Sequence, residues 1–226
     1  MDELIFFINR VLISGTVLGS IYALGAIGIT LIFGILRFAH FAHGDMMTMG
    51  AFIGFLLAGL LASLGIVTPI PAGFVVLPLA MVLTAIIALG LDKGFYAPLR
   101  RRGVPSVTLM IASIGVTLMI QGLIRLIFGS GTKSFFGNES KDIFRIDMTA
   151  FGGSRPITIT EPQVLMIVVT VLLVLALHYF LTRSRLGKAM RAMADNAALA
   201  QVSGINTAVV VRVTWLIAGA LACVAG

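Results

Sequence analysis

The sequence contains few reactive or charged residues. One of its 226 residues is a cysteine and one is a tryptophan, while Asp, Glu, Lys and Arg together make up 11%. The lone cysteine, Cys223, excludes an intrachain disulfide and is expected to fill space within its apolar run. No Walker sequence, glycine-rich phosphate loop or Ser/His/Asp set is present. The chain is therefore predicted not to be an enzyme and to hold no metal or cofactor, so any energy source must come from outside it.

Apolar residues dominate instead. They make up 59% of the chain, and the mean hydropathy is +1.09, which is too apolar for one soluble core. Six apolar stretches have about the 17 to 25 residues that a helix needs to cross a bilayer. They cover about residues 11–36, 44–66, 70–91, 107–128, 163–181 and 209–226. The predicted fold class is an all-α, polytopic transmembrane helical bundle with about six crossings. Because the last stretch stops within an apolar run, we expect the chain to be truncated at its C-terminus.

The basic residues predict the orientation. Three connections that alternation places on one side carry nine of the 16 Lys and Arg residues, namely Arg37, Lys93, Arg100, Arg101, Arg102, Arg183, Arg185, Lys188 and Arg191. The opposite side holds Arg10 and the long connection 129–162, in which four basic residues are balanced by four acidic ones. The positive-inside rule therefore places the three basic connections in the cytoplasm and the N-terminus outside. The net charge of +7 is explained by these loops and the anionic inner leaflet, and no nucleic-acid partner is predicted.

The stretch from Arg183 to Gly204 is predicted to be a cytoplasmic helix that contacts a partner. One stripe at helical spacing contains Leu186, Met190, Met193, Ala197 and Ala200, while Lys188, Arg191 and Asp195 lie elsewhere on its surface. Helices that lie on a membrane usually present Trp, Phe or Leu to it. Small residues and methionine suit a protein groove better. The alternative is a basic anchor on the membrane surface, in a subunit with a structural or assembly role.

A polar stripe runs along the fourth apolar stretch. Ser113, Thr117, Gln121 and Arg125 recur at every fourth residue, so they share one side of the predicted helix and are not expected to face lipid. Two interpretations remain open. The stripe either forms hydrogen bonds between helices, with Arg125 reaching the outer interface, or Ser113, Thr117 and Gln121 form a wall of a solute path.

The first two stretches are joined by a short connection with two histidines. His40, His43 and Asp45 would permit a metal site, but no further His or Cys cluster completes one. A turn into the second helix, with Asp45 near the positive helix N-terminus, is favoured over a metal site. A proton relay is a further alternative, although secondary transporters usually place ionisable groups near the bilayer midplane.

Two glycine pairs predict close helix packing. Gly15 and Gly19 are four residues apart in the first stretch, and Gly50 and Gly54 repeat this spacing in the second. Such small-xxx-small patterns let two helix backbones approach each other within a membrane.

Two segments together resemble the permease subunits of branched-chain amino acid ABC importers. The first runs from Gly19 to Asp45. It begins with Gly19-Ser-Ile-Tyr-Ala-Leu-Gly and ends with Arg37-Phe-Ala-His-Phe-Ala-His-Gly-Asp45. The second comprises Arg185-Leu-Gly-Lys-Ala-Met-Arg-Ala and the continuation to Ile205, and the similarity covers essentially the whole chain. The family turn motif consists of Phe41, Ala42, His43, Gly44 and Asp45. The resemblance implies that residues 1–226 are one permease domain, incomplete at the C-terminus, in a bacterial or archaeal plasma (inner) membrane.

The resemblance also implies partners and a coupling element. The partners are a second related permease, two cytoplasmic ATPases that bind the ATP and Mg, and a periplasmic or extracellular solute-binding protein. Residues 183–205 would be the coupling helix that enters a cleft of the ATPase. Its implied contacts are Leu186, Gly187, Met190, Arg191, Met193, Ala197, Ala200 and Gly204. The glutamate that such importers commonly carry in this element is absent here, which predicts a more apolar contact. Urea and short-amide importers use similar permeases and remain an alternative.

Overall fold

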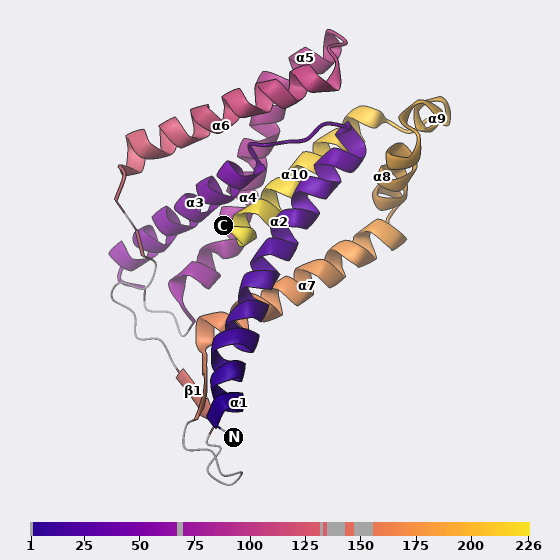
Figure 1. The fold of residues 1–226 in the computed structure, drawn as a ribbon. Coiled ribbons are helices and arrows are strands. Elements are labelled where there is room, and N and C mark those ends of the chain that lie inside the picture. Colours follow the sequence, from indigo (N-terminus) through magenta and orange to yellow (C-terminus); the bar gives the residue numbers. More distant parts are fainter. Residues whose placement is uncertain (1, 67–69, 132, 135–142, 147–155) are drawn as a thin grey trace.

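The computed structural model describes residues 2–66, 70–131, 133–134, 143–146 and 156–226. Six helical spans in this part are long and apolar enough to cross a membrane. Their bounds are Glu3–Leu36, His43–Ser63, Ala72–Arg101, Ser106–Phe128, Glu161–Arg183 and Thr207–Ala225. The predicted polytopic helical fold is confirmed (Figure 1).

Two of the spans are longer than predicted because a π-helical turn joins shorter α-helices end to end. The first consists of α1 (Asp2–Phe7), η1 (Ile8–Ile13) and α2 (Ser14–Leu36), and the third of α4 (Ala72–Leu91), η2 (Asp92–Tyr96) and α5 (Ala97–Arg101). The third predicted stretch ended at residue 91, just before the charged residues 92 and 93. They do not end the helix, because the Asp92 carboxylate pairs with Arg100 of the same span at 2.7 Å.

The remaining elements complete the bundle and its connections. They are α3 (His43–Ser63), α6 (Ser106–Phe128), α7 (Glu161–Arg183), α8 (Arg185–Asp195), α9 (Ala197–Val202) and α10 (Thr207–Ala225). An antiparallel hairpin of β1 (Ile143–Ile146) and β2 (Ile157–Thr160) was not predicted. It lies beside η1, where Asn9 Nδ2 donates to the Pro156 carbonyl and Asn9 Oδ1 accepts from the amide of Thr158. Most charges of the connection 129–162 fall on residues 135–142 and 147–155, outside the described residues.

The core is organised around α10, which packs against α2, α3 and α4 (Figure 1). Trp215 of α10 is fully buried beside Tyr96, with ring centroids 5.2 Å apart in a stacked arrangement. The Asn206 side chain caps the start of α10 by accepting a hydrogen bond from the amide of Val209.

One of the two glycine pairs contributes to this packing. A Cβ atom added at Gly50 would lie 2.6 Å from the Cα of Cys223, so α3 and α10 approach closely there. Cys223 is itself buried, as expected of an apolar core residue. Cβ atoms added at Gly15 and Gly19 would meet nothing within 4 Å. That pair has no packing neighbour among the described residues, so its packing role stays a prediction.

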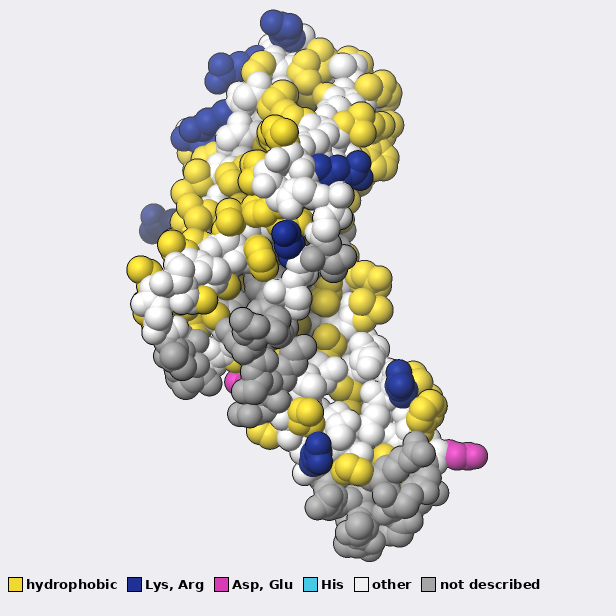
Figure 2. Space-filling view, turned by 90° about the vertical axis from the view of Figure 1, so that its left-hand side faces the viewer, with side chains coloured by type: hydrophobic (Ala, Val, Ile, Leu, Met, Phe, Trp, Pro, Cys, Tyr) yellow, Lys and Arg dark blue, Asp and Glu magenta, His cyan; other side chains and the backbone are white. Residues whose placement is uncertain are grey.

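The basic connections gather at one end of the bundle. The turn after α2, the segment from α5 to α6, and α8 with α9 all lie at the upper end in Figure 1, while the N-terminus and the hairpin lie at the lower end. We call the upper end the loop end. On the face seen in Figure 2, most of the Lys and Arg side chains lie toward this end.

Candidate functional site

The turn at the loop end is held in place by Arg37. This residue ends α2 in the left-handed conformation, with φ of 57°, and its amide donates to the Phe33 carbonyl. Its guanidinium Nη2 donates a hydrogen bond to the carbonyl of Ala194 in the last turn of α8. A cation at a helix C-terminus is favourable because the last carbonyls carry partial negative charge. Arg37 thus connects the end of the first span to α8.

His40 of this turn lies in an aromatic enclosure. It is fully buried, its Nδ1 lies 3.1 Å from the Tyr96 hydroxyl, and its ring meets Trp215 edge-on at 5.0 Å. Burial, followed by the nearby charge of His43, lowers the pKa of His40 to about 3, so the ring is neutral at physiological pH. Among the described residues no three His, Cys, Asp or Glu side chains gather into a metal cluster. The observed contacts of His40 are those of a structural side chain.

The family turn motif begins α3 and packs it against α2. Ala42 and His43 are buried, whereas Phe41 and Gly44 are exposed. A Cβ atom at Gly28 would lie 2.6 Å from Nε2 of His43, so the imidazole occupies the space that the absent side chain leaves. Asp45 lies in the first turn of α3, as predicted.

The polar stripe of α6 meets this same motif. Ser113 Oγ accepts a hydrogen bond from the amide of Phe41 at 3.1 Å, and Gln121 Nε2 donates to Asp45 Oδ1 at 3.0 Å. The buried hydroxyl of Thr117 has no hydrogen-bond partner among the described residues. The structure therefore brings together two sets of residues that the sequence analysis treated separately. It favours the interhelical interpretation for Ser113 and Gln121, and a solute path along this stripe stays a prediction.

The predicted coupling helix is two helices with a bend between them. Ser184 caps α8 by accepting from the amide of Gly187, and Asn196 caps α9 by accepting from the amides of Ala198 and Leu199. The extended backbone of Asn196, with φ of −151° and ψ of 105°, interrupts the helix. Gly204 follows α9 in a left-handed conformation, with φ of 84°. We call residues 185–204 the elbow.

The inner face of the elbow is occupied by the chain itself. Met190 and Met193 are 2% and 7% exposed and pack in one cluster with Ile35, Ala200 and Val210. Gly187 is buried against the backbone of α7. The prediction that Met190 and Met193 face a partner is wrong, because both side chains anchor the elbow to α2 and α10. Leu186 and Ala197, from the same predicted stripe, are exposed.

The outer face of the elbow carries different side chains. Arg191 is exposed, as are two large apolar residues of α9, Leu199 at 65% and Val202 at 88%. The sequence analysis missed Leu199 and Val202 because it assumed one uninterrupted helix. The signal that would have found them is Asn196, a residue type that commonly caps a new helix, followed by Ala-Ala-Leu-Ala-Gln.

Comparisons with known proteins identify the family of this chain. Residues 11–226 match the family described as branched-chain amino acid transport system / permease component. The high-affinity branched-chain amino acid transport system permease protein LivH of Escherichia coli K12 is 32% identical, over all of this chain and 71% of its own length. BraD of Pseudomonas aeruginosa, with the same description, is 31% identical over the same shares. A probable LivH of Methanocaldococcus jannaschii is 26% identical over 96% of this chain and 65% of its own length.

No solved structure matches the chain. The family match nevertheless covers the turn, the polar stripe of α6 and the elbow, all within residues 11–226. Together with six apolar spans, it makes the chain a multi-pass plasma-membrane transport subunit and not an enzyme. The chain belongs to the permease component family of branched-chain amino acid transport systems.

Proposed function

We propose that this chain is a membrane subunit of an ATP-driven importer of branched-chain amino acids. The observation that carries the proposal is the family match over residues 11–226, joined by relatives whose names specify branched-chain amino acid transport. In this proposal the loop end is cytoplasmic and the N-terminus lies outside. The basic connections at the loop end support that orientation.

The elbow is the proposed contact with a cytoplasmic ATPase. Its inner face is fixed by Met190 and Met193, and its outer face presents the exposed side chains of Leu199 and Val202. Helix α9, which carries both, lies at the loop end in Figure 1. Large apolar side chains exposed outside the membrane spans mark a surface that contacts either a protein or the bilayer. We take the protein contact because the chain belongs to a transport-system permease family. We therefore propose the contact at α9 and Arg191, and not at the methionines of α8.

The anchoring of the elbow provides a route for mechanical coupling. The elbow contacts α7 through Gly187, and it contacts α2 and α10 through Met190 and Met193. Arg37 joins the elbow to the turn that follows α2. A displacement imposed on α9 by closing ATPases would then be transmitted to three membrane spans together. Such rigid-body movement of packed helices is an established way to turn a small local change into a gating motion.

The proposed assembly contains a second related permease, two ATPase subunits that hold ATP and Mg, and a soluble binding protein that delivers the substrate. The solute path in this proposal runs between the two permeases. A lightly polar wall such as the Thr117 side of α6 would let an amino acid pass without holding it tightly. Urea and short amides are the alternative cargo.

Transport assays test the cargo. The chain is co-expressed with its ATPase, partner permease and binding-protein genes in cells that lack their own importer, and uptake of labelled leucine is measured. We expect uptake that stops when ATP is depleted, survives an uncoupler that leaves ATP intact, and is inhibited by isoleucine and valine. Inhibition by urea or acetamide and not by isoleucine would contradict the proposed cargo. Loss of uptake with the uncoupler alone would indicate a proton-driven carrier.

Cysteine crosslinking tests the ATPase contact. The single native cysteine is buried, so Val202→Cys introduces one accessible thiol. We expect this thiol to crosslink to the co-expressed ATPase, while the matched variant Met193→Cys, 7% exposed, stays unreactive. Crosslinking from position 193 and not from position 202 would refute the placement of the contact on α9. Labelling of position 202 by lipid probes alone would favour a membrane anchor.

A further inference from the structure

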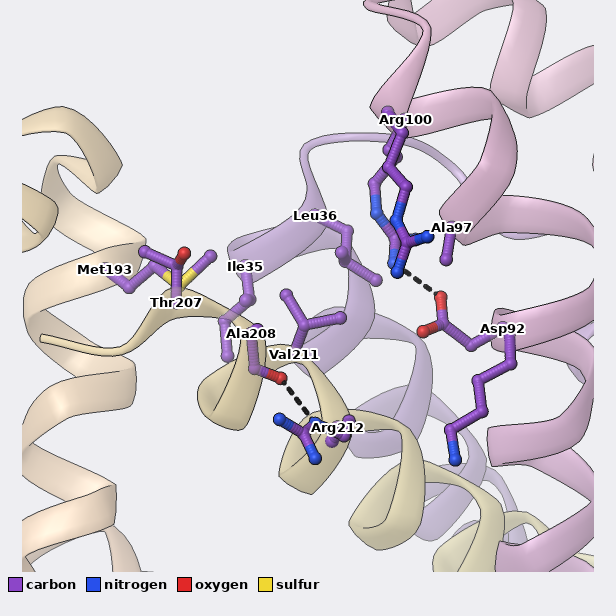
Figure 3. Close-up of a pocket in the computed structure, with 12 residues that line it drawn as sticks. Ile35, Leu36, Asp92, Ala97, Arg100, Met193, Thr207, Ala208, Val211 and Arg212 are labelled. Atoms are coloured by element: carbon purple, nitrogen blue, oxygen red, sulfur yellow. Dashed lines mark hydrogen bonds and ion pairs between the residues drawn. The ribbon is translucent and has the colours of Figure 1, made fainter.

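A cavity of about 590 Å³ opens at the loop end between three parts of the chain (Figure 3). Its walls come from the end of α2, the segment from η2 to α5, and the start of α10, with Met193 of the elbow at one side. Met193 and Ile35 of the elbow's anchoring cluster form part of its wall, and the remaining lining lies outside the motifs discussed above.

The polar lining of the cavity is strongly basic. Four cations line it, Lys93, Arg100, Arg101 and Arg212, against one carboxylate, that of Asp92. Among the carboxylates that the structure describes, Asp92 alone forms an ion pair, and its partner is Arg100. Lys93, Arg101 and Arg212 therefore leave an excess of positive charge in the cavity.

Arg212 is held in position to contribute to this charge. Its Nε donates to the Ala208 carbonyl at 3.1 Å, which leaves its two terminal nitrogens available (Figure 3). Thr207 and Ala208, the first two residues of α10, also line the cavity. The N-terminus of a helix adds partial positive charge to an anion site.

The rest of the lining is apolar. Ile35 and Leu36 from the last turn of α2, Ala97 of α5 and Val211 of α10 form these walls. All of them lie at ends of membrane-spanning helices, where a bilayer places its headgroups beside the first carbons of its acyl chains. A basic pocket with apolar walls at this level fits a lipid headgroup and its glycerol region.

The geometry points to a site for the phosphate headgroup of an anionic phospholipid, bound between Lys93, Arg101 and Arg212. Clusters of basic residues between membrane helices on the cytoplasmic side bind such headgroups. The assignment of the lipid to the inner leaflet rests on the orientation proposed above. The binding itself depends only on the cavity. Because Met193 lines the same cavity, a bound lipid bridges the elbow to the third span and steadies the element proposed to receive the ATPase.

Lipid retention measured by native mass spectrometry tests this site. The full chain is purified in nanodiscs that contain phosphatidylglycerol and phosphatidylcholine, released into detergent and examined for bound lipid. We expect one phosphatidylglycerol to be retained in preference to phosphatidylcholine. Lys93→Gln and Arg212→Gln should each weaken retention about fivefold, because each cation near an anionic lipid contributes a comparable factor. The double variant should lose preferential retention.

The matched control is Arg102→Gln, because Arg102 is exposed at the same end but does not line the cavity. It should retain phosphatidylglycerol as the unmodified chain does. Equal loss in this control, or full retention in the double variant, would overturn the site. The same measurement is made with inorganic phosphate alone. If the chain retains inorganic phosphate as well as it retains phosphatidylglycerol, the lipid is overturned as the source of the phosphate. Substrate and ATPases play no part in this measurement, so its failure would leave the import proposal intact.

Discussion

Gly187→Ala tests whether the elbow is seated directly on α7. An added Cβ atom would lie 2.3 Å from the carbonyl oxygen of Phe180, 2.5 Å from the Cα of Leu181 and 2.8 Å from the Leu181 oxygen. All three atoms belong to the backbone of α7, so no side-chain rotation can relieve the overlap. Ordinary contact begins at 3.4 Å. The elbow must therefore move away from α7 by about 1 Å to restore ordinary separations.

The expected stability change is the difference between two opposing effects. Alanine in place of glycine within a helix stabilises by about 1 kcal/mol. Overpacking against a rigid neighbour costs about 1–3 kcal/mol. Since three backbone atoms are approached within 3.0 Å, the upper part of that range applies and a net loss of about 2 kcal/mol is expected. The displacement also moves the α9 surface that the ATPase is proposed to contact.

Thermal unfolding of the purified chain in detergent and leucine uptake by the assembled transporter measure these two effects. We expect Gly187→Ala to lower the unfolding midpoint and to reduce uptake per molecule in the membrane. The control is Gly115→Ala in α6, where an added Cβ would meet nothing within 4 Å. It should be neutral or stabilising by up to about 1 kcal/mol. Equal stability and equal uptake in the two variants would refute the seating of α8 on α7.

Three further predictions follow from the site. Gln121→Leu removes the donor to Asp45 and should destabilise the chain by about 1.5–3 kcal/mol in thermal unfolding, as expected for a hydrogen bond to a charged group; an unchanged midpoint with lost uptake would instead favour a solute path. The Val202 side chain is 88% exposed, so Val202→Asp should change the unfolding free energy by less than about 0.5 kcal/mol. The same variant should uncouple ATP hydrolysis from uptake, and normal coupling would contradict the α9 contact. Because burial lowers the pKa of His40 from 6.5 to about 3, the unfolded chain binds the extra proton between these values and stability should fall as the pH drops below 6.5. The slope from this group is at most about 1.4 kcal/mol per pH unit, and His40→Gln should show a shallower decline across unfolding curves at pH 7 and pH 5; identical slopes would contradict a buried neutral imidazole.

The membrane spans could be predicted because hydropathy over about 20 residues depends on composition alone. Their ends were harder to predict. The third span continues past Asp92 and Lys93 because an ion pair within the same span, to Arg100, accommodates the Asp92 carboxylate. The position of the hairpin β1–β2 beside η1 involves hydrogen bonds from Asn9 to Pro156 and Thr158, which are nearly 150 residues away in the chain.

The site was predicted in parts and joined incorrectly. Spacing showed that Ser113 and Gln121 share one side of a helix, but it could not show that this side meets the turn at Phe41 and Asp45. The stripe through Met190 and Met193 was recognised as a contact surface, and its partner proved to be the chain's own α2 and α10. Periodicity identifies a buried face and does not identify what buries it.

The position of α10 has a consequence for biosynthesis. The helix pair α3 and α4 packs directly, whereas α2 meets this pair mainly through α10, which lies between them (Figure 1). During membrane insertion the first span therefore lacks its most extensive contacts until residues 207–225 have left the ribosome and entered the bilayer. Helices that associate after insertion are free to find wrong neighbours in that interval. A Cβ atom added at Gly219 would lie 2.6 Å from the Cβ of Ala88. Substitutions at Gly219 should then lower the yield of assembled protein. They should leave a population in which the earlier spans are inserted but are accessible to quality-control proteases.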